Sequence, residues 1–412
     1  MRKIDPSEAP FLPYGRQLIE EDDIAAVAEV LRGDWLTTGP AVEAFERALC
    51  EVTDAKHAIA CANGTAALHM AALALELAPE DRVIVPSVTF LATANAVRLA
   101  GAEVVFADCD PDNGLMEETH LKDAIARAAR SSGGPVKAVF PVLLAGQCAD
   151  PRGLRRVAGE NGLQVVEDAA HAIGSRYYGE ANSDRPVGDA RQATMTAFSF
   201  HPVKTIAMGE GGAVTTNDDS LAESLRRLRS HGMLREAGEL SNRDLAFDET
   251  GAVNPWYYEM PKVGLNYRVT DIQCALGLSQ IRKLDRFVAR RRALAARYDD
   301  LLADLAPLVR PITKSPAGRA AWHLYAVLID FEAAGLSRAR LVERLMAVGV
   351  GTQVHYIPVH LQPYYRGRYG ALNLPGAERY YARTLSLPLF PAMRDEDVER
   401  VVDALARALR QS

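Results

Sequence analysis

Lys204 stands where a lysine could act as a nucleophile. It ends the motif Ser-Phe-His-Pro-Val-Lys at 199–204, after the apolar run 193–200, and the glycine-rich turn 209–212 follows it. A lysine forms a Schiff base when burial and neighbouring groups lower the pKa of its amine until the free base is present. The alternative for Lys204 taken alone is an ordinary surface lysine beside a turn.

An acidic residue upstream changes the interpretation of Lys204. Asp168 follows the apolar run Leu163–Val166 and belongs to the sequence Glu-Asp-Ala-Ala-His at 167–171. A carboxylate at a strand end can keep a pyridine nitrogen protonated, which makes the ring an electron sink. Pyridoxal phosphate (PLP) uses a lysine on its aldehyde and a carboxylate on its ring nitrogen. The alternative for Asp168 taken alone is a helix N-cap.

A third segment could bind the phosphate of such a cofactor. The sequence Asn-Gly-Thr-Ala-Ala-Leu at 63–68 follows the β-like run His57–Cys61 and opens a helical stretch. The first turn of a helix has free N–H groups and a positive dipole end, so Gly64 and Thr65 mark a candidate phosphate site. A plain helix cap is the alternative here as well.

Three further side chains could complete a site for a flat, phosphorylated cofactor. Phe90 follows the β-like run Arg82–Val85, where its ring could stack on the cofactor; the alternative is a core phenylalanine. His171 could contact the cofactor ring or its phenolic oxygen, with a structural hydrogen bond as the alternative. Ser199 could add a hydroxyl to the phosphate.

An alternating pattern of apolar runs must position these residues. We expect strands at 57–61, 82–85, 103–107, 136–142 and 163–167, and helices at 20–31, 42–52, 66–77, 91–99, 121–130 and 154–158. Alternating strands and helices predict an α/β fold with a large, mostly parallel sheet covered on both faces. Such sheets bind ligands at the carboxyl ends of their strands.

The chain is expected to divide into three parts: an N-terminal arm, a large cofactor-binding domain and a smaller C-terminal α/β domain. Their bounds are 1–19, 20–285 and 286–412, with the boundary inside one long helix, or two in line, from 271 to 305. In the small domain we expect strands at 322–329 and 351–356 and helices at 338–348 and 395–409. The basic run 290–292 is interpreted as a solvated helix face, with a binding patch as the alternative.

Composition excludes several classes of function. The chain has 412 residues, of which 48% are hydrophobic and 24% charged, as in an ordinary globular protein. Its formal charge of −6 argues against general binding to nucleic acid or to a membrane surface. The five cysteines form no CxxC pair, so we expect reduced thiols in a cytoplasmic protein and no metal site. No stretch is long and apolar enough to span a bilayer.

Taken together and in this order, the segments resemble the DegT/DnrJ/EryC1/StrS family of PLP-dependent sugar aminotransferases. The resemblance runs from about Pro13 to the C-terminal helix, and the motif at 199–204 with Glu-Gly-Gly at 210–212 is its most specific part. It implies aminotransferase fold type I: a large, mostly parallel sheet domain and a smaller C-terminal α/β domain.

Two subgroups of the family are most similar to this sequence. One forms UDP-4-amino-4,6-dideoxy-N-acetyl-β-L-altrosamine in pseudaminic acid synthesis; it is similar at 198–204, 229–234, 266–268, 275–280, 323–325 and 353–358. The other makes UDP-4-amino-4-deoxy-L-arabinose and is similar at 321–324 and 386–391. The chain departs from the first subgroup at its phosphate turn and at Ile206-Ala207-Met208.

The resemblance also implies residue roles. In the cofactor site, Lys204 would hold PLP, Asp168 would pair with its ring nitrogen, and Phe90 would stack on the ring; Gly64, Thr65, Ala66 and Ser199 would hold the phosphate. Asn266 would reach the phosphate from the neighbouring subunit of a homodimer. The substrate side would use Tyr14, Thr37, Thr38, Arg268, His355 and Tyr356.

The implied reaction moves an amino group from L-glutamate to the 4-keto carbon of a UDP-linked deoxy-keto-sugar, with the cofactor cycling through pyridoxamine phosphate. Three alternatives stay open: amination of another nucleotide-linked keto-sugar, a PLP-dependent 3-dehydratase of the same fold, and a non-catalytic regulator. The dehydratases have histidine in place of the Schiff-base lysine, so Lys204 argues against them. A dinucleotide-binding dehydrogenase is excluded because no GxGxxG motif follows the first strand.

Overall fold

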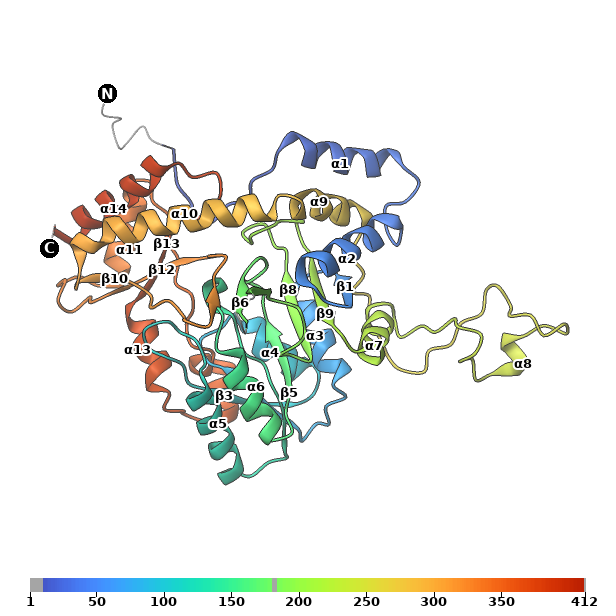
Figure 1. The fold of residues 1–412 in the computed structure, drawn as a ribbon. Coiled ribbons are helices and arrows are strands. Elements are labelled where there is room, and N and C mark those ends of the chain that lie inside the picture. Colours follow the sequence, from blue (N-terminus) through green and yellow to red (C-terminus); the bar gives the residue numbers. More distant parts are fainter. Residues whose placement is uncertain (1–9, 180–183, 411–412) are drawn as a thin grey trace.

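A computed structural model describes residues 10–179 and 184–410, and a seven-stranded sheet forms its centre (Figure 1). The strand order is β1-β9-β8-β5-β4-β2-β3. The bounds are β1 (His57–Cys61), β2 (Arg82–Pro86), β3 (Glu103–Ala107), β4 (Val136–Val139), β5 (Gln164–Asp168), β8 (Met195–Ser199) and β9 (Gly212–Thr216). Strand β9 runs antiparallel to both neighbours, whereas β8, β5, β4, β2 and β3 are parallel. The expected mostly parallel sheet is therefore confirmed.

Helices cover both faces of this sheet. They are α2 (Pro40–Thr53), α3 (Gly64–Ala74), α4 (Leu91–Leu99), α5 (Glu118–Arg130), α6 (Pro151–Glu160), α7 (Asp219–Arg229) and α9 (Asp271–Ile281). Helix α1 (Glu21–Arg32) lies outside this layer and packs against α9 (Figure 1). Val83 and Val85 of β2 share a core with α3, α4 and α7, while Ile84 between them packs with α5 and α6. Because successive side chains of a strand point to opposite faces, an entirely apolar strand needs helices on both sides.

A second core lies C-terminal to the large sheet. It is built from α10 (Leu284–Leu302), β10 (Val309–Pro311), β12 (Tyr325–Ile329), α11 (Arg338–Ala347), β13 (Thr384–Leu387) and α14 (Asp395–Arg410). Helix α10 reaches both regions: Phe287 packs with the sheet helices, and Leu294 packs in the second core. The domain boundary near residue 285 stays a prediction.

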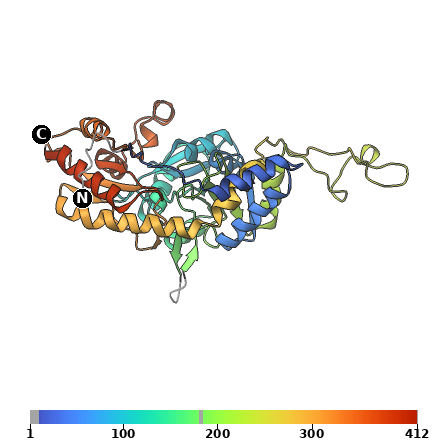
Figure 2. The same ribbon diagram turned by 90° about the horizontal axis from the view of Figure 1, so that it is seen from above.

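The remaining elements are short. They are η1 (Leu144–Gly146), β6 (Arg176–Tyr178), β7 (Asp184–Pro186), α8 (Arg243–Ala246), η3 (Ala303–Leu305), β11 (Gly318–Arg319), η4 (Val359–Leu361), α12 (Pro363–Tyr369) and α13 (Pro375–Arg383). The segment that carries α8 projects from the body of the molecule (Figure 2). Within the described ranges, no helix combines the length and apolar character that a bilayer span requires.

Two sequence expectations were wrong. Residues 351–356 do not form a strand; only Gln353 pairs, through one bridge to Ser386. The neighbours His355 and Tyr356 both face one pocket, which the alternation of an extended strand would not allow. The basic run is not a solvated face either, because Arg291 is fully buried and donates to the carbonyls of Trp322, His323 and Leu389.

Candidate active site

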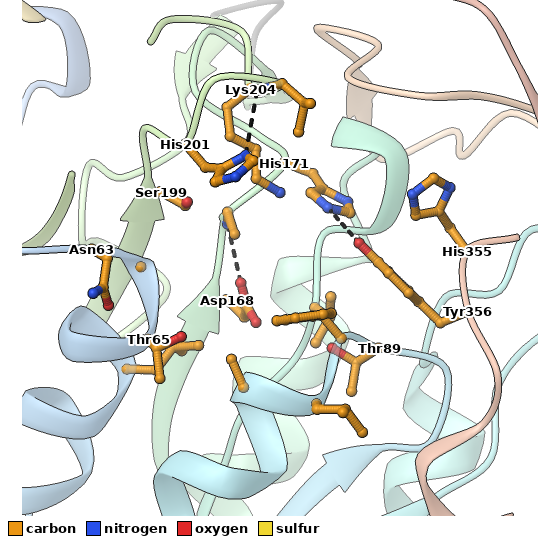
Figure 3. A pocket seen from close by; sticks show the side chains of 18 of the residues that line it. Asn63, Thr65, Thr89, Asp168, His171, Ser199, His201, Lys204, His355 and Tyr356 are labelled. Carbon is orange, nitrogen blue, oxygen red and sulfur yellow. Dashed lines mark hydrogen bonds between the residues drawn. The ribbon is translucent and has the colours of Figure 1, made fainter. Parts of the chain in front are cut away.

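One pocket of about 860 Å³ opens at the carboxyl ends of the parallel strands (Figure 3). Asp168 ends β5, Ser199 ends β8, and the turn after β1 begins α3 at Gly64. The predicted site residues that line the pocket are Tyr14, Gly64, Thr65, Ala66, Phe90, Asp168, His171, Ser199, Lys204, His355 and Tyr356. The fold therefore gathers segments separated by more than three hundred residues around one cavity.

Lys204 enters this pocket from the loop after β8. A backbone bond from Lys204 to the His201 carbonyl (2.8 Å) closes the turn that carries it. Burial lowers the pKa of the Lys204 amine to about 8, and the negative charge of Asp168 only partly opposes that effect. The unprotonated fraction of the amine near neutral pH is therefore far larger than for an ordinary lysine, as a nucleophile or general base requires.

Asp168 is a buried carboxylate that faces the same cavity. Its Oδ2 accepts a bond from Thr93 Oγ1 (2.7 Å), and its Oδ1 accepts one from the Ala170 backbone N–H (3.1 Å). Burial raises the pKa of Asp168 above its ordinary value, while these two bonds and Lys204 oppose the rise. Among the described residues no cation lies within ion-pair distance of Asp168, whose two oxygens accept only from Thr93 and Ala170, so the protonated nitrogen of a ligand could pair with this carboxylate.

The start of α3 forms a narrow cup beside Ser199. Asn63 caps the helix by accepting a bond from Ala66 N–H (2.8 Å), and Gly64 and Thr65, whose N–H groups are free in the first turn of a helix, line the pocket. A Cβ at Gly64 would lie 2.7 Å from Ser199 Cβ, closer than two such atoms can approach. A glycine is therefore needed for helix and strand to meet closely enough to hold a phosphate between them.

A methyl group at this close contact tests the cup. We expect Gly64→Ala to weaken PLP binding about 10- to 100-fold, because a clash in a packed site costs about 1–3 kcal/mol. Titration of the apo-protein with PLP, followed by visible absorbance, measures the change. Gly159→Ala is the matched control, since Gly159 is also helical but has open space around its Cβ position. Equal PLP affinity in both variants would contradict the assignment of the cup.

Aromatic and imidazole side chains form the opposite wall (Figure 3). The Phe90 ring lies 5.9 Å from that of Tyr356, and the Tyr14 ring lies 5.4 Å from that of His355. His171 Nε2 is 3.1 Å from Tyr356 Oη. Burial lowers the pKa of His355 to about 3 and that of His171 well below its ordinary value, so both rings are neutral. This wall offers flat surfaces and hydrogen-bonding groups without adding positive charge.

Four predicted residues do not line this pocket. Thr37 and Thr38 lie in the loop before α2, where Thr37 pairs with Thr270 through one bridge. Asn266 pairs with Ser230, and Arg268 follows two residues later. The functional roles of these four residues stay predictions; for Asn266, the family resemblance implies a role in the pocket of a neighbouring subunit.

Sequence reasoning also missed several residues. Thr89, His201, Glu210, Tyr267 and Gln353 line the pocket, and Thr93 holds Asp168 without lining it. Thr93 lies one helical turn after Phe90, at the start of α4. This spacing puts the two side chains on the same face of the helix and could have indicated that Thr93 lies near the site. The hydrogen bond from Thr93 to Asp168 joins residues 75 positions apart, so no local sequence pattern predicts it.

Comparisons with known proteins find similar sequences and structures. A family model described as "DegT/DnrJ/EryC1/StrS aminotransferase family" matches residues 17–406. The spore coat polysaccharide biosynthesis protein SpsC of Bacillus subtilis is 39% identical over 398 residues, which cover 96% of each chain.

Two solved structures are similar over nearly the whole chain. Helicobacter pylori PseC, an aminotransferase involved in pseudaminic acid biosynthesis, has a TM-score of 0.85 at 28% identity and covers 98% of this chain and 100% of its own. The PLP form of Spr1654 from Streptococcus pneumoniae, described as a "putative sugar aminotransferase", has a TM-score of 0.84 at 27% identity and covers 97% of this chain and 99% of its own. Its pyridoxamine phosphate form has the same TM-score and identity.

Proposed function

This chain belongs to the DegT/DnrJ/EryC1/StrS aminotransferase family, and we propose that it transfers an amino group from L-glutamate to the 4-keto carbon of a UDP-linked deoxy-keto-sugar. It is a sugar aminotransferase whose cofactor is PLP, cycling through pyridoxamine phosphate. One observation carries the proposal: a lysine amine with a pKa of about 8 and a buried carboxylate without a cation face the same pocket.

The pocket residues fit PLP. When bound, PLP supplies an aldehyde for amines and a ring that delocalises the charge left on carbon after proton loss. Lys204 would hold the cofactor and then move the proton between carbon atoms as a general base and acid. Asp168 would accept the N–H of the protonated ring nitrogen, with Thr93 and Ala170 fixing its two oxygens. The N–H groups at Gly64 and Thr65, with Ser199, would hold the phosphate.

The residues proposed to contact the cofactor ring and the sugar form the walls of the pocket. Phe90 lines the pocket with 56% of its surface exposed, so its ring is free to pack against the cofactor. His355 and Tyr356 lie on the side away from the α3 cup (Figure 3), the Tyr14 ring lies 5.4 Å from that of His355, and all three would contact the sugar. Because His171 and His355 are neutral, they add no positive charge near the amine of Lys204.

We place the product among the 4-amino sugars of surface polysaccharides. Formation of UDP-4-amino-4,6-dideoxy-N-acetyl-β-L-altrosamine is the specific reaction proposed, supported by the resemblance to PseC over the whole chain. The alternative is another nucleotide-linked keto-sugar, and the higher identity to SpsC, a protein of spore coat polysaccharide biosynthesis, favours it.

The proposal includes a homodimer with shared active sites in the cytoplasm. Arginine is absent from the described lining of the pocket, so the diphosphate of a nucleotide sugar would find Arg268 only on a neighbouring subunit, whose Asn266 would reach the phosphate of PLP. The five cysteines are unpaired, which suits a reducing compartment.

An absorbance experiment tests the function. The purified protein with PLP should show a visible band that disappears when L-glutamate converts the cofactor to pyridoxamine phosphate. Adding a UDP-, dTDP- or GDP-linked 4-keto-sugar should restore the band only for the true acceptor. Absence of any band after incubation with PLP would reject the proposal, and restoration by a dTDP- or GDP-sugar alone would reject the UDP carrier.

A further inference from the structure

One backbone contact fixes which nitrogen of His171 carries the proton. Ala145 lies 3.3 Å away and donates its backbone N–H to His171 Nδ1, so Nδ1 is an acceptor. Because burial holds the pKa of His171 far below its ordinary value, the ring is neutral and its one proton is on Nε2. His171 Nε2–H therefore donates to Tyr356 Oη over 3.1 Å.

The direction of this bond determines what Tyr356 can do. Its oxygen already accepts from His171, so its own O–H proton is available for another acceptor. Burial raises the pKa of Tyr356 above its ordinary value, which keeps the hydroxyl protonated. No described residue accepts that proton, and the ring lines the pocket (Figure 3).

The surrounding backbone holds Ala145 in place. Ala145 has a φ of 60°, a left-handed conformation that a residue with a side chain adopts only when its neighbours enforce it. Its carbonyl accepts the N–H of His323 (3.0 Å), and the His323 ring packs 4.4 Å from that of His171. Buried Arg291 donates to the His323 carbonyl (3.1 Å). The acceptor state of His171 Nδ1 is thus built into the fold.

We propose that Ala145, His171 and Tyr356 form a one-way hydrogen-bond chain, which makes Tyr356 a donor to an oxygen atom of the molecule bound in the pocket. His171 is then a positioning residue. The inference rests on the proposed function only for the identity of that molecule. Two oxygens have the required chemistry, a sugar oxygen of the substrate and the phenolic oxygen of PLP, and the variants below separate them.

The tautomer of His171 can be determined by NMR in the protein without cofactor. In apo-protein labelled with ¹⁵N-histidine, long-range ¹H–¹⁵N spectra should show His171 as a neutral ring protonated on Nε2 across the neutral pH range. The loss of its signals in His171→Gln assigns them, and His57→Gln, at a histidine whose Nε2 is hydrogen-bonded to Asp219, should leave them unchanged. Protonation of Nδ1 would overturn the proposal, and this result is independent of any enzymatic activity.

Tyr356→Phe removes the donor and keeps the ring. If the acceptor is a sugar oxygen, we expect about a tenfold slower sugar half-reaction, as for one lost hydrogen bond, with an unchanged visible band and glutamate half-reaction. If the acceptor is the phenolic oxygen, the band should shift and PLP should bind more weakly before any sugar is added. Tyr364→Phe, at an exposed site, is the control. A variant that behaves as wild type in every assay would disprove the donor role.

Conservative replacement of His171 tests its positioning role. A glutamine can still offer an N–H to Tyr356, so His171→Gln should retain most of the affected rate, whereas His171→Leu should reproduce the Tyr356→Phe defect. The double variant His171→Leu/Tyr356→Phe should be no slower than Tyr356→Phe, because both changes interrupt one chain. Additive losses would show that the two residues act separately.

Discussion

Replacing Lys204 with alanine is expected to abolish amino-group transfer in both half-reactions. Loss of the general base alone should slow proton transfer by about 10²–10⁴-fold, and the covalent link to PLP is lost as well. Because the pKa of Lys204 is about 8, roughly a tenth of the amine is free base at pH 7, far more than for an ordinary lysine. Stopped-flow measurement of the glutamate half-reaction gives the effect directly.

The fold should survive this change, which makes the result interpretable. The pKa of Lys204 is lower in the folded state than in the unfolded chain, so the unfolded chain binds more protons from about pH 8 to about pH 10.5. Stability of the wild-type apo-protein should therefore rise with pH in that window, and the Lys204→Ala protein should lack that rise. Retained turnover in a well-folded Lys204→Ala protein would refute the assigned chemistry.

Asp168→Asn is expected to produce the second largest loss, about 10²–10³-fold in the glutamate half-reaction. The asparagine fills the same space but carries no charge to hold a proton on the ring nitrogen of PLP. It also turns an amide N–H₂ toward either Thr93 Oγ1–H or the Ala170 N–H, and both of these are donors to Asp168. Rates of loss of the visible band with glutamate, at saturating PLP, measure the effect.

Thr93 provides a graded comparison for Asp168. Thr93→Val keeps the carboxylate and its charge but removes one bond to Oδ2, so we expect about a tenfold loss. Thr93→Ser should restore most of the rate because the hydroxyl returns. If Thr93→Val were as damaging as Asp168→Asn, orientation of the carboxylate, and not its charge, would be the dominant contribution.

The sequence contained local signals for most of the sheet and the pocket. Strands such as Glu103–Ala107 and helices such as Leu91–Leu99 were predicted at their observed bounds. The spacing of apolar residues and the residues that begin or end an element can both be recognised within a few positions of the sequence. The pocket followed from the rule that parallel strands gather ligands at their carboxyl ends, which brought Lys204, Asp168 and Gly64 together.

The remaining features depend on contacts between distant segments. Burial of Arg291 depends on backbone carbonyls of Trp322, His323 and Leu389, whose positions are fixed only once both cores have packed. The left-handed conformation of Ala145 depends on His323 in the same way. A basic run and an alanine have no local pattern that reveals such partners, so the sequence predicted a solvated face in the first case and nothing in the second.

The wide separation of the pocket residues along the chain also sets an order of events during synthesis. Tyr14 and Gly64 leave the ribosome early, Asp168 and Lys204 near the middle, and Tyr356 only when most of the chain has emerged. A nascent chain that ends before Tyr356 can form the parallel sheet but lacks one wall of the cavity. The sugar side of the site is therefore completed late, nearly post-translationally, and ribosome-bound chains truncated before residue 350 should not carry out the sugar half-reaction.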